Sequence, residues 1–279
     1  MKNYQNRIVV KVGTSTLINE LGKSDLRSFD KLACVLSDIQ NMGYEVILVS
    51  SGAIAVGTNK LNMKERPSSM RMKQAAAAVG QCSIMYLYDK FFGDYDKIIA
   101  QILLNAEDIE QEEKKENLSN TFQALLEMGI IPVVNENDSV SYTEIESEDR
   151  LFGDNDMLSA VVAILCRAQR LVILSDIDGL YDADPRLYPN AKLIDRIDRI
   201  DDSVYALAGG AGSRRGTGGM KTKLQAAGLA TAQGIDVVIT NGKAPEALYD
   251  IVKGNKAGTL FTGKSSTPVY SAQSGRQCP

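Results

Sequence analysis

The sequence predicts an α/β protein built on a mainly parallel sheet with helices on both faces. Segments rich in β-branched residues alternate with helical segments along the chain, an order typical of parallel sheets with right-handed crossovers. The strand-like segments are almost continuously apolar, as expected of strands buried on both faces. Polar or glycine-rich stretches follow these strands. They should therefore gather along one edge of the sheet.

The elements are expected where short apolar runs alternate with longer periodic segments. Strands are expected at residues 7–12, 44–49, 97–104, 129–134, 170–174 and 235–240. Helices are expected at residues 26–42, 70–92, 111–128, 155–166, 221–233 and 245–252. Gly43 suits the end of the first helix. The alanine-rich helix 70–92, interrupted by Gly80, indicates close helix packing or a subunit contact, and the charged run in 111–128 is typical of a solvated face.

Composition excludes several classes of protein. The 279 residues are 44% hydrophobic and 24% charged, which is typical of a globular chain with a sizeable core. The N-terminus lacks a signal-peptide pattern and no apolar run reaches ~20 residues, so we expect a cytoplasmic protein without membrane contact. A net charge of −4 argues against a nucleic-acid partner, because that role needs Lys and Arg to neutralise phosphates.

The chain contains no histidine, and its four cysteines lie far apart. The lack of an imidazole excludes Ser-His-Asp and Cys-His mechanisms and His-ligated metal. The cysteine spacing does not indicate a zinc or redox site. Any chemistry must therefore use Lys, Arg, Asp, Glu, hydroxyl and backbone groups.

Three polar stretches are candidates for a site at the sheet edge. Residues 151–160 place Asp154, Asn155 and Asp156 before an apolar helix, whose N-terminal N–H groups favour anions. Ser50-Ser51-Gly52 follow one strand, and residues 135–139 follow another. Consecutive polar side chains after a buried strand are costly unless they face water, a metal or a ligand. The alternatives are a capped helix, a tight turn and a solvated loop.

The strongest phosphate-binding signal is the glycine-dense, basic loop 209–220, which leads into the helix 221–233. Glycine N–H groups can approach phosphates, and Lys221 and Lys223 add positive charge at a helix N-terminus. A flexible linker is the alternative. Lys11 is unusual within an apolar strand, so we expect it to lie at the end of the sheet or to pair with an anionic group. A solvated lysine on an edge strand is the alternative.

Two motif-like segments are not assigned their usual meaning. Residues 258–265 match the letters of a P-loop, but that motif must precede a helix of a βαβ unit, and a polar tail follows here. The alternating aspartates of residues 175–185 do not have the spacing of an EF-hand. A nucleotide-contacting loop fits them better.

Seven segments together resemble the amino acid kinase family. They are VVKVGTSTL from Val9, SSGAIAVG from Ser50, AAVGQ from Ala77, VNENDSV from Val134, FGDNDMLSA from Phe152, SDIDGLYDADPR from Ser175 and GTGGMKTKLQAA from Gly216. The resemblance implies a three-layer αβα sandwich over residues 1–265, whose N-terminal half binds an amino acid and whose C-terminal half binds ATP. We expect residues 266–279 to be a disordered polar tail, without the RNA-binding-type PUA domain that many members carry.

The activity implied by the resemblance is phosphorylation of the γ-carboxylate of L-glutamate by ATP with Mg²⁺, the first step of proline biosynthesis. In that reaction Lys11 and Lys223 stabilise the phosphoryl group and Asp156 holds them in place. The implied glutamate contacts are Ser51, Gly52, Asp138 and Asn155. The implied nucleotide contacts are Lys11, Ser175, Asp176, Thr217, Gly218, Gly219, Met220, Lys221, Thr222 and Lys223. No side chain is assigned to a metal.

The resemblance also implies partners and leaves alternatives open. Feedback inhibition by L-proline, a homodimer or homotetramer, and hand-over to glutamate-5-semialdehyde dehydrogenase are expected. The alternatives are a sister kinase acting on N-acetylglutamate, aspartate, carbamate or a nucleoside monophosphate, and a catalytically silent nucleotide-binding regulator. Arg214 and Arg215 receive no specific role.

Overall fold

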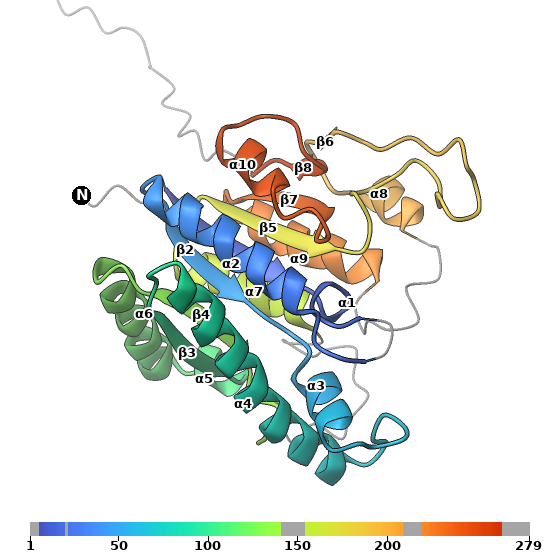
Figure 1. The fold of residues 1–279 in the computed structure, drawn as a ribbon. Coiled ribbons are helices and arrows are strands. Elements are labelled where there is room, and N and C mark those ends of the chain that lie inside the picture. Colours follow the sequence, from blue (N-terminus) through green and yellow to red (C-terminus); the bar gives the residue numbers. More distant parts are fainter. Residues whose placement is uncertain (1–5, 20–21, 141–153, 209–218, 264–279) are drawn as a thin grey trace, which may run out of the picture.

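The chain is organised around an eight-stranded sheet with the order β3-β4-β2-β1-β5-β7-β8-β6 (Figure 1). The computed structural model describes residues 6–19, 22–140, 154–208 and 219–263. The strands are β1 (Arg7–Val12), β2 (Glu45–Val49), β3 (Ile99–Leu104), β4 (Ile131–Glu136), β5 (Arg170–Ser175), β6 (Arg196–Ile197), β7 (Asp236–Asn241) and β8 (Thr259–Phe261). All pairings are parallel except that of β7 with β8. The predicted fold class is confirmed.

Helices cover both faces of this sheet (Figure 1). The helices are α1 (Thr14–Leu17), α2 (Leu26–Asn41), α3 (Ala53–Lys60), α4 (Met70–Asp94), α5 (Glu107–Glu110), α6 (Glu112–Glu127), α7 (Asn155–Leu165), α8 (Asp202–Leu207), α9 (Met220–Ala232) and α10 (Ala247–Val252). One apolar core joins the sheet to α2, α4 and α10, and the other joins it to α6, α7 and α9. The architecture is therefore the predicted three-layer αβα sandwich.

Strand β1 shows why the sequence contains continuous apolar runs. Ile8 and Val10 belong to one core, and Val9 belongs to the other. Because successive side chains of a strand point to opposite faces, a strand covered on both faces needs apolar residues at every position. β1 lies between β2 and β5, so both of its faces are covered.

Helices α3 and α4 cross at backbone contact. A Cβ atom added to Gly57 would lie 1.7 Å from the Ala76 carbonyl oxygen, and one added to Gly80 would lie 1.8 Å from the Ala53 carbonyl oxygen. The close packing expected of the alanine-rich helix is confirmed. Gly80 does not interrupt α4, which runs unbroken from Met70 to Asp94, because the packing requires glycine there. The alternative subunit contact stays a prediction.

The expected long elements are present with small shifts of their ends, and the shortest elements were missed. β6 and β8 have two and three residues, too few for a periodic pattern. β8 covers the middle of the P-loop-like segment and pairs antiparallel with β7. These residues form a strand and not a phosphate-binding turn, as expected. The tail 266–279, which we expect to be disordered, lies outside the described residues.

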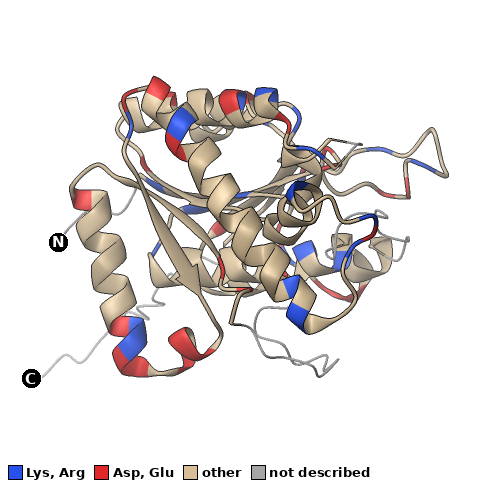
Figure 2. Cartoon of the chain, turned by 60° about the horizontal axis from the view of Figure 1, so that its bottom comes forward, with Lys and Arg blue, Asp and Glu red and all other residues tan. Residues whose placement is uncertain are grey.

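The charged residues are spread over many elements. In the view of Figure 2, Lys and Arg alternate with Asp and Glu along the helices and loops and do not form one basic face. No helix in the described part of the chain is long and apolar enough to cross a membrane.

Candidate active site

The centre of the candidate site is a buried carboxylate between two lysines. Lys11 Nζ lies 2.6 Å from Asp156 Oδ1, and Lys223 Nζ lies 3.0 Å from Asp156 Oδ2. Lys11, Asp156 and Lys223 are only 7%, 1% and 6% exposed. Burial acts to raise the pKa of Asp156, but the two ammonium groups outweigh it and lower that pKa to about 2. Two lysines and one aspartate leave a net positive charge that suits an anion.

Three elements far apart in the sequence bring these side chains together. Lys11 comes from β1, and Lys223 lies in the first turn of α9. Asp154 caps α7, because its Oδ1 accepts from the backbone N–H groups of Asp156 at 2.9 Å and Met157 at 3.1 Å. This cap places Asp156 in the first turn of α7, facing both lysines. The anionic partner expected for Lys11 is therefore confirmed, and the alternative of an edge strand is wrong.

Thr222 ties the start of α9 to the same carboxylate. Its Oγ1 lies 3.2 Å from Asp156 Oδ2 and 2.9 Å from the carbonyl oxygen of Gly219. Gly219 is the N-cap residue of α9, and Met220 and Lys221 follow in the first turn. The N-terminus of α9 thus lies beside the lysine cluster, where its N–H groups favour an anion.

A group of polar side chains joins the N-terminus of α7 to the ends of β2 and β4. Asn155 Nδ2 donates to the Ser50 backbone carbonyl and, at 2.9 Å, to Asn135 Oδ1. Asn135 Nδ2 donates to Gln81 Oε1 on α4, also at 2.9 Å. Asn135 is 2% exposed. The polar stretches after β2 and β4 therefore converge on Asn155, as the sequence predicts.

The stretch after β2 is also connected to the end of β1. Ser51 Oγ donates to the Val12 carbonyl at 3.1 Å and lies 3.2 Å from Thr14 Oγ1. Gly52 has a φ of 98°, a left-handed conformation that a side chain would strain. This turn lets α3 begin directly after β2 with Ser51 at the sheet edge.

Asp138 lies beyond β4, three residues after Asn135, and is half-buried. Burial raises the pKa of Asp138 to about 6, and the positive charge of Arg66 offsets part of this rise. No hydrogen bond or ion pair among the described residues joins it to Asp156. A partly desolvated carboxylate at this edge is suited to bind a cationic group.

The ends of β5 and β7 form the other side of the edge. Ser175 Oγ donates to Asp176 Oδ1 at 3.2 Å, and the Gly242 N–H donates to the Ser175 carbonyl at 2.7 Å. A Cβ atom on Gly242 would lie 2.4 Å from Thr16 Oγ1, so the turn after β7 packs against α1. Ser175 is buried and Asp176 is exposed. Of the expected nucleotide contacts, Thr217 and Gly218 lie outside the described residues, as do Arg214 and Arg215.

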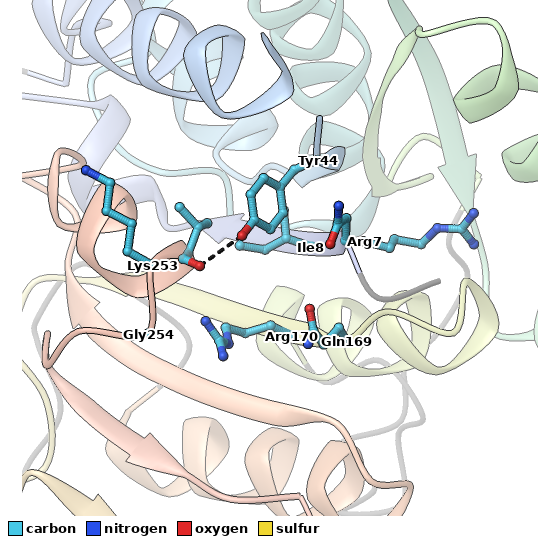
Figure 3. A pocket seen from close by; sticks show the side chains of 9 residues that line it. Arg7, Ile8, Tyr44, Gln169, Arg170, Lys253 and Gly254 are labelled. Atoms are coloured by element: carbon cyan, nitrogen blue, oxygen red, sulfur yellow. Dashed lines mark hydrogen bonds between the residues drawn. The ribbon is translucent and has the colours of Figure 1, made fainter. Parts of the chain in front are cut away.

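A separate cavity of about 270 Å³ lies at the amino ends of the strands, on the opposite side of the sheet from the candidate site (Figure 3). It is bordered by Arg7 and Arg170, the first residues of β1 and β5. Arg170 donates to the Ile251 carbonyl at the end of α10, and Tyr44 Oη donates to the next carbonyl, that of Val252, at 2.9 Å. These contacts fasten α10 to the sheet. The polar residues around the cavity therefore have a structural role, and the cavity is not part of the candidate site.

In the described part of the chain, no group of three or more Cys, Asp or Glu side chains is arranged to hold a metal ion. The arrangement instead offers ammonium groups and helix N-terminal N–H groups. Such a donor set fits phosphates and carboxylates.

The sheet order and the helices on both faces define an α/β fold, and the Lys11–Asp156–Lys223 cluster at the carboxyl ends of its strands is suited to anionic ligands. The chain belongs to the amino acid kinase family, whose model matches residues 6–241. It is 54% identical over 258 residues to Glutamate 5-kinase of Clostridium perfringens, covering 92% of this chain and 96% of the relative. It is 49% identical over 264 residues to Glutamate 5-kinase of Listeria innocua, covering 95% of each chain.

Solved structures support the same fold at much lower identity. Carbamate kinase from Giardia lamblia bound to AMP-PNP matches with a TM-score of 0.65 and 15% identity, covering 92% of this chain and 98% of that chain. UMP kinase from Bacillus anthracis matches with a TM-score of 0.62 and 14% identity, covering 93% and 97%. At such identities the likeness concerns the fold alone.

Some residues that shape the site were not singled out from the sequence. Asn135 belongs to the polar stretch 135–139, but the sequence does not indicate which of these five side chains points into the protein. Gln81 ends the AAVGQ segment of the family resemblance, but it receives no role there, and its helix is interpreted as a packing or subunit-contact element. The contact of Gln81 with Asn135 joins residues 54 positions apart, and no local pattern reports such a contact.

Proposed function

We propose that this chain transfers the γ-phosphoryl group of ATP to the γ-carboxylate of L-glutamate, forming L-glutamyl 5-phosphate in the first step of proline biosynthesis. The observation that carries the proposal is the buried Lys11–Asp156–Lys223 cluster at the sheet edge. It occurs in a chain about half identical to proteins named Glutamate 5-kinase over nearly their whole length.

On the acceptor side, glutamate is held by groups at the ends of β2 and β4 and the start of α7. Ser51, Gly52 and Asn155 lie where hydroxyl, N–H and amide groups can bind its carboxylates and ammonium group. Asp138 is the carboxylate suited to the ammonium group. Its partial burial supports this role, because a desolvated charge gains more from an opposite charge than a solvated one does.

On the donor side, ATP is held at the ends of β5 and β7 and the start of α9. Ser175 and Asp176 follow β5, and residues Gly219 to Lys223 supply N–H groups and positive charge for the phosphates. We include Thr217 and Gly218 in the same loop on the basis of the sequence. The two substrates would then meet at the lysine cluster between the two halves of the sheet.

The residues present can perform this reaction without a general base. A glutamate γ-carboxyl with a pKa near ~4.3 is already ionised at neutral pH. Its oxygen attacks the γ-phosphorus, and ADP leaves. Lys11 and Lys223 place positive charge along the transferring group, and Asp156 fixes the direction of both ammonium groups. Mg²⁺ bound to the nucleotide would neutralise charge on the β- and γ-phosphates.

Regulation and assembly follow as proposals from the same resemblance. We propose feedback inhibition by L-proline, a homodimer or homotetramer, and hand-over of the reactive acyl phosphate to glutamate-5-semialdehyde dehydrogenase. The cytoplasmic location, the domain limits at residues 1–265 and the absence of nucleic-acid partners stay predictions.

Hydroxylamine trapping tests the proposed reaction, because hydroxylamine converts an acyl phosphate into a coloured hydroxamate. The protein is incubated with ATP and Mg²⁺ and with glutamate, N-acetylglutamate or aspartate, with and without proline. We expect signal with glutamate alone and a lower signal with proline. Signal with another acceptor would assign the chain to a sister activity, and ATP binding without any product would favour a nucleotide-binding regulator.

A further inference from the structure

A chain of three side-chain amides connects the buried side of helix α4 with the start of α7. It runs from Gln81 through Asn135 to Asn155, with two hydrogen bonds of 2.9 Å each. At its far end Asn155 Nδ2 also donates to the backbone carbonyl of Ser50. The two hydrogen bonds join residues 54 and 20 positions apart in the sequence, so this chain of amides forms only in the folded protein.

The carbonyl of Ser50 fixes the direction of every hydrogen bond in this chain. A backbone carbonyl can only accept, so Asn155 must turn its NH₂ group toward Ser50. The same NH₂ group then faces Asn135, which must present its oxygen. Asn135 therefore turns its own NH₂ group toward Gln81, and Gln81 must present Oε1. Turning any one amide around would place two donors or two acceptors in contact.

This direction determines what Asn155 offers to a ligand. Both N–H bonds of its amide are engaged, by Ser50 and Asn135. Within the described residues no donor is bound to Asn155 Oδ1. The chain thus presents a hydrogen-bond acceptor at the sheet edge, which suits a donor group such as an ammonium group.

We infer that Gln81 is a positioning residue for substrate binding: its Oε1 holds Asn135, and Asn135 keeps the acceptor face of Asn155 toward the ligand. This inference rests on the proposed function, because it takes the ligand to be the ammonium-bearing substrate. Gln81 acts through the other two amides and is not placed in contact with the substrate.

Helix α4 is well placed to hold this end of the chain rigidly. Gly80, the neighbour of Gln81, brings α4 to backbone contact with α3 at Ala53. Further along the same helix, the fully buried Tyr88 places its Oη 2.9 Å from Ser50 Oγ. The same helix therefore fixes both Gln81 and the residue whose carbonyl sets the direction of the chain.

Two substitutions at Gln81 separate positioning from mere packing. Gln81→Glu keeps an oxygen acceptor for Asn135, whereas Gln81→Met keeps the length and helix preference but removes the acceptor. We expect Gln81→Met to raise the KM for glutamate about tenfold, the loss expected for one unmade hydrogen bond. The KM for ATP should change less than about twofold. Gln81→Glu should restore the KM for glutamate to within about threefold of wild type.

The matched control is Gln225→Met, the same change at an exposed position of α9, which should leave both KM values unchanged. Thermal unfolding checks that each variant is folded. If Gln81→Met does not fold, Gln81→Asn withdraws the acceptor by one methylene and should give the same selective rise.

The inference is overturned if Gln81→Met binds glutamate normally, if Gln81→Glu is as impaired as Gln81→Met, or if the KM values for both substrates rise together. A wild-type protein without glutamate turnover would instead refute the proposed function. The two failures are therefore distinguishable.

Discussion

Removing the carboxylate of the central cluster should destabilise the protein much more than removing one of its lysines. Asp156→Asn takes a 1% exposed carboxylate away from two lysines that are 7% and 6% exposed. Buried charges deprived of their partner typically cost ~3–5 kcal/mol. Lys11→Met leaves Asp156 paired with Lys223 at 3.0 Å, so the remaining charges still balance. We expect a cost of about 1 kcal/mol or less for that variant.

The lowered pKa of Asp156 reflects the same interaction with the two lysines. Lowering this pKa from 3.8 to about 2 favours the ionised carboxylate in the folded state by roughly 2 kcal/mol. Because the pKa is lower in the folded state, this contribution is present above pH ~4 and is lost as the pH falls toward ~2. The Asp156→Asn variant should lack this acid-sensitive part of its stability.

Urea unfolding at neutral pH measures the stability of both variants, and hydroxamate formation measures their activity. The turnover of Lys11→Met should be ~10²–10³-fold lower, because the ammonium group of Lys11 stabilises the transferring phosphoryl group in the proposed reaction. Asp195→Asn is the control, since its ion pair with Lys256 is exposed and surface pairs contribute little to stability. Equal stability losses in Asp156→Asn and Lys11→Met, or near-normal turnover of Lys11→Met, would refute this account of the cluster.

Further predictions concern the acceptor side and the helix packing. The kcat/KM for glutamate should fall as the pH drops through about 6, because burial raises the pKa of Asp138 to that value and the protonated acid no longer attracts an ammonium group. The kcat/KM of Asp138→Asn should not show this fall. A kcat/KM of the wild type that does not change between about pH 5 and 7 would refute the role of Asp138 in binding the ammonium group. Gly80→Ala should destabilise the fold by about 3 kcal/mol, because the added Cβ would lie 1.8 Å from a backbone oxygen. Gly93→Ala, in the same helix but with nothing within 4 Å, should instead gain ~0.5–1 kcal/mol in urea unfolding. An unaffected Gly80→Ala would show that α3 and α4 are not locked together.

Local sequence predicted those features that depend on local pattern. Continuous apolar runs gave the long strands, and the polar stretches after them gave the edge where Lys11, Asn155 and Asp156 meet. Lys11 was identifiable because a charged residue in a doubly covered strand needs a partner. Its particular partner also followed, but only from the resemblance to a family.

Features that depend on three-dimensional packing could not be predicted from the sequence. The poor helix propensity of glycine predicts an interruption of the helix at Gly80. Its missing side chain instead allows backbone contact with α3, which outweighs that propensity. The contact between Gln81 and Asn135 could not be predicted for a related reason. A hydrogen-bonded amide chain depends on which side chains face each other after folding, and polar residues of the same type on the surface look identical in the sequence.

The two carboxylates of the site differ in a way that assigns them separate parts of the proposed reaction. Asp156 has a pKa of about 2, since the lysines outweigh the effect of its burial, so it stays ionised near neutral pH and cannot carry a proton. Its contribution is to orient ammonium groups. Asp138 has a pKa of about 6, raised by burial, so its charge changes close to neutral pH. Any pH dependence in that range should therefore appear in the binding of the amino acid and not in the phosphoryl transfer, which a histidine-free site can perform with charges that stay constant.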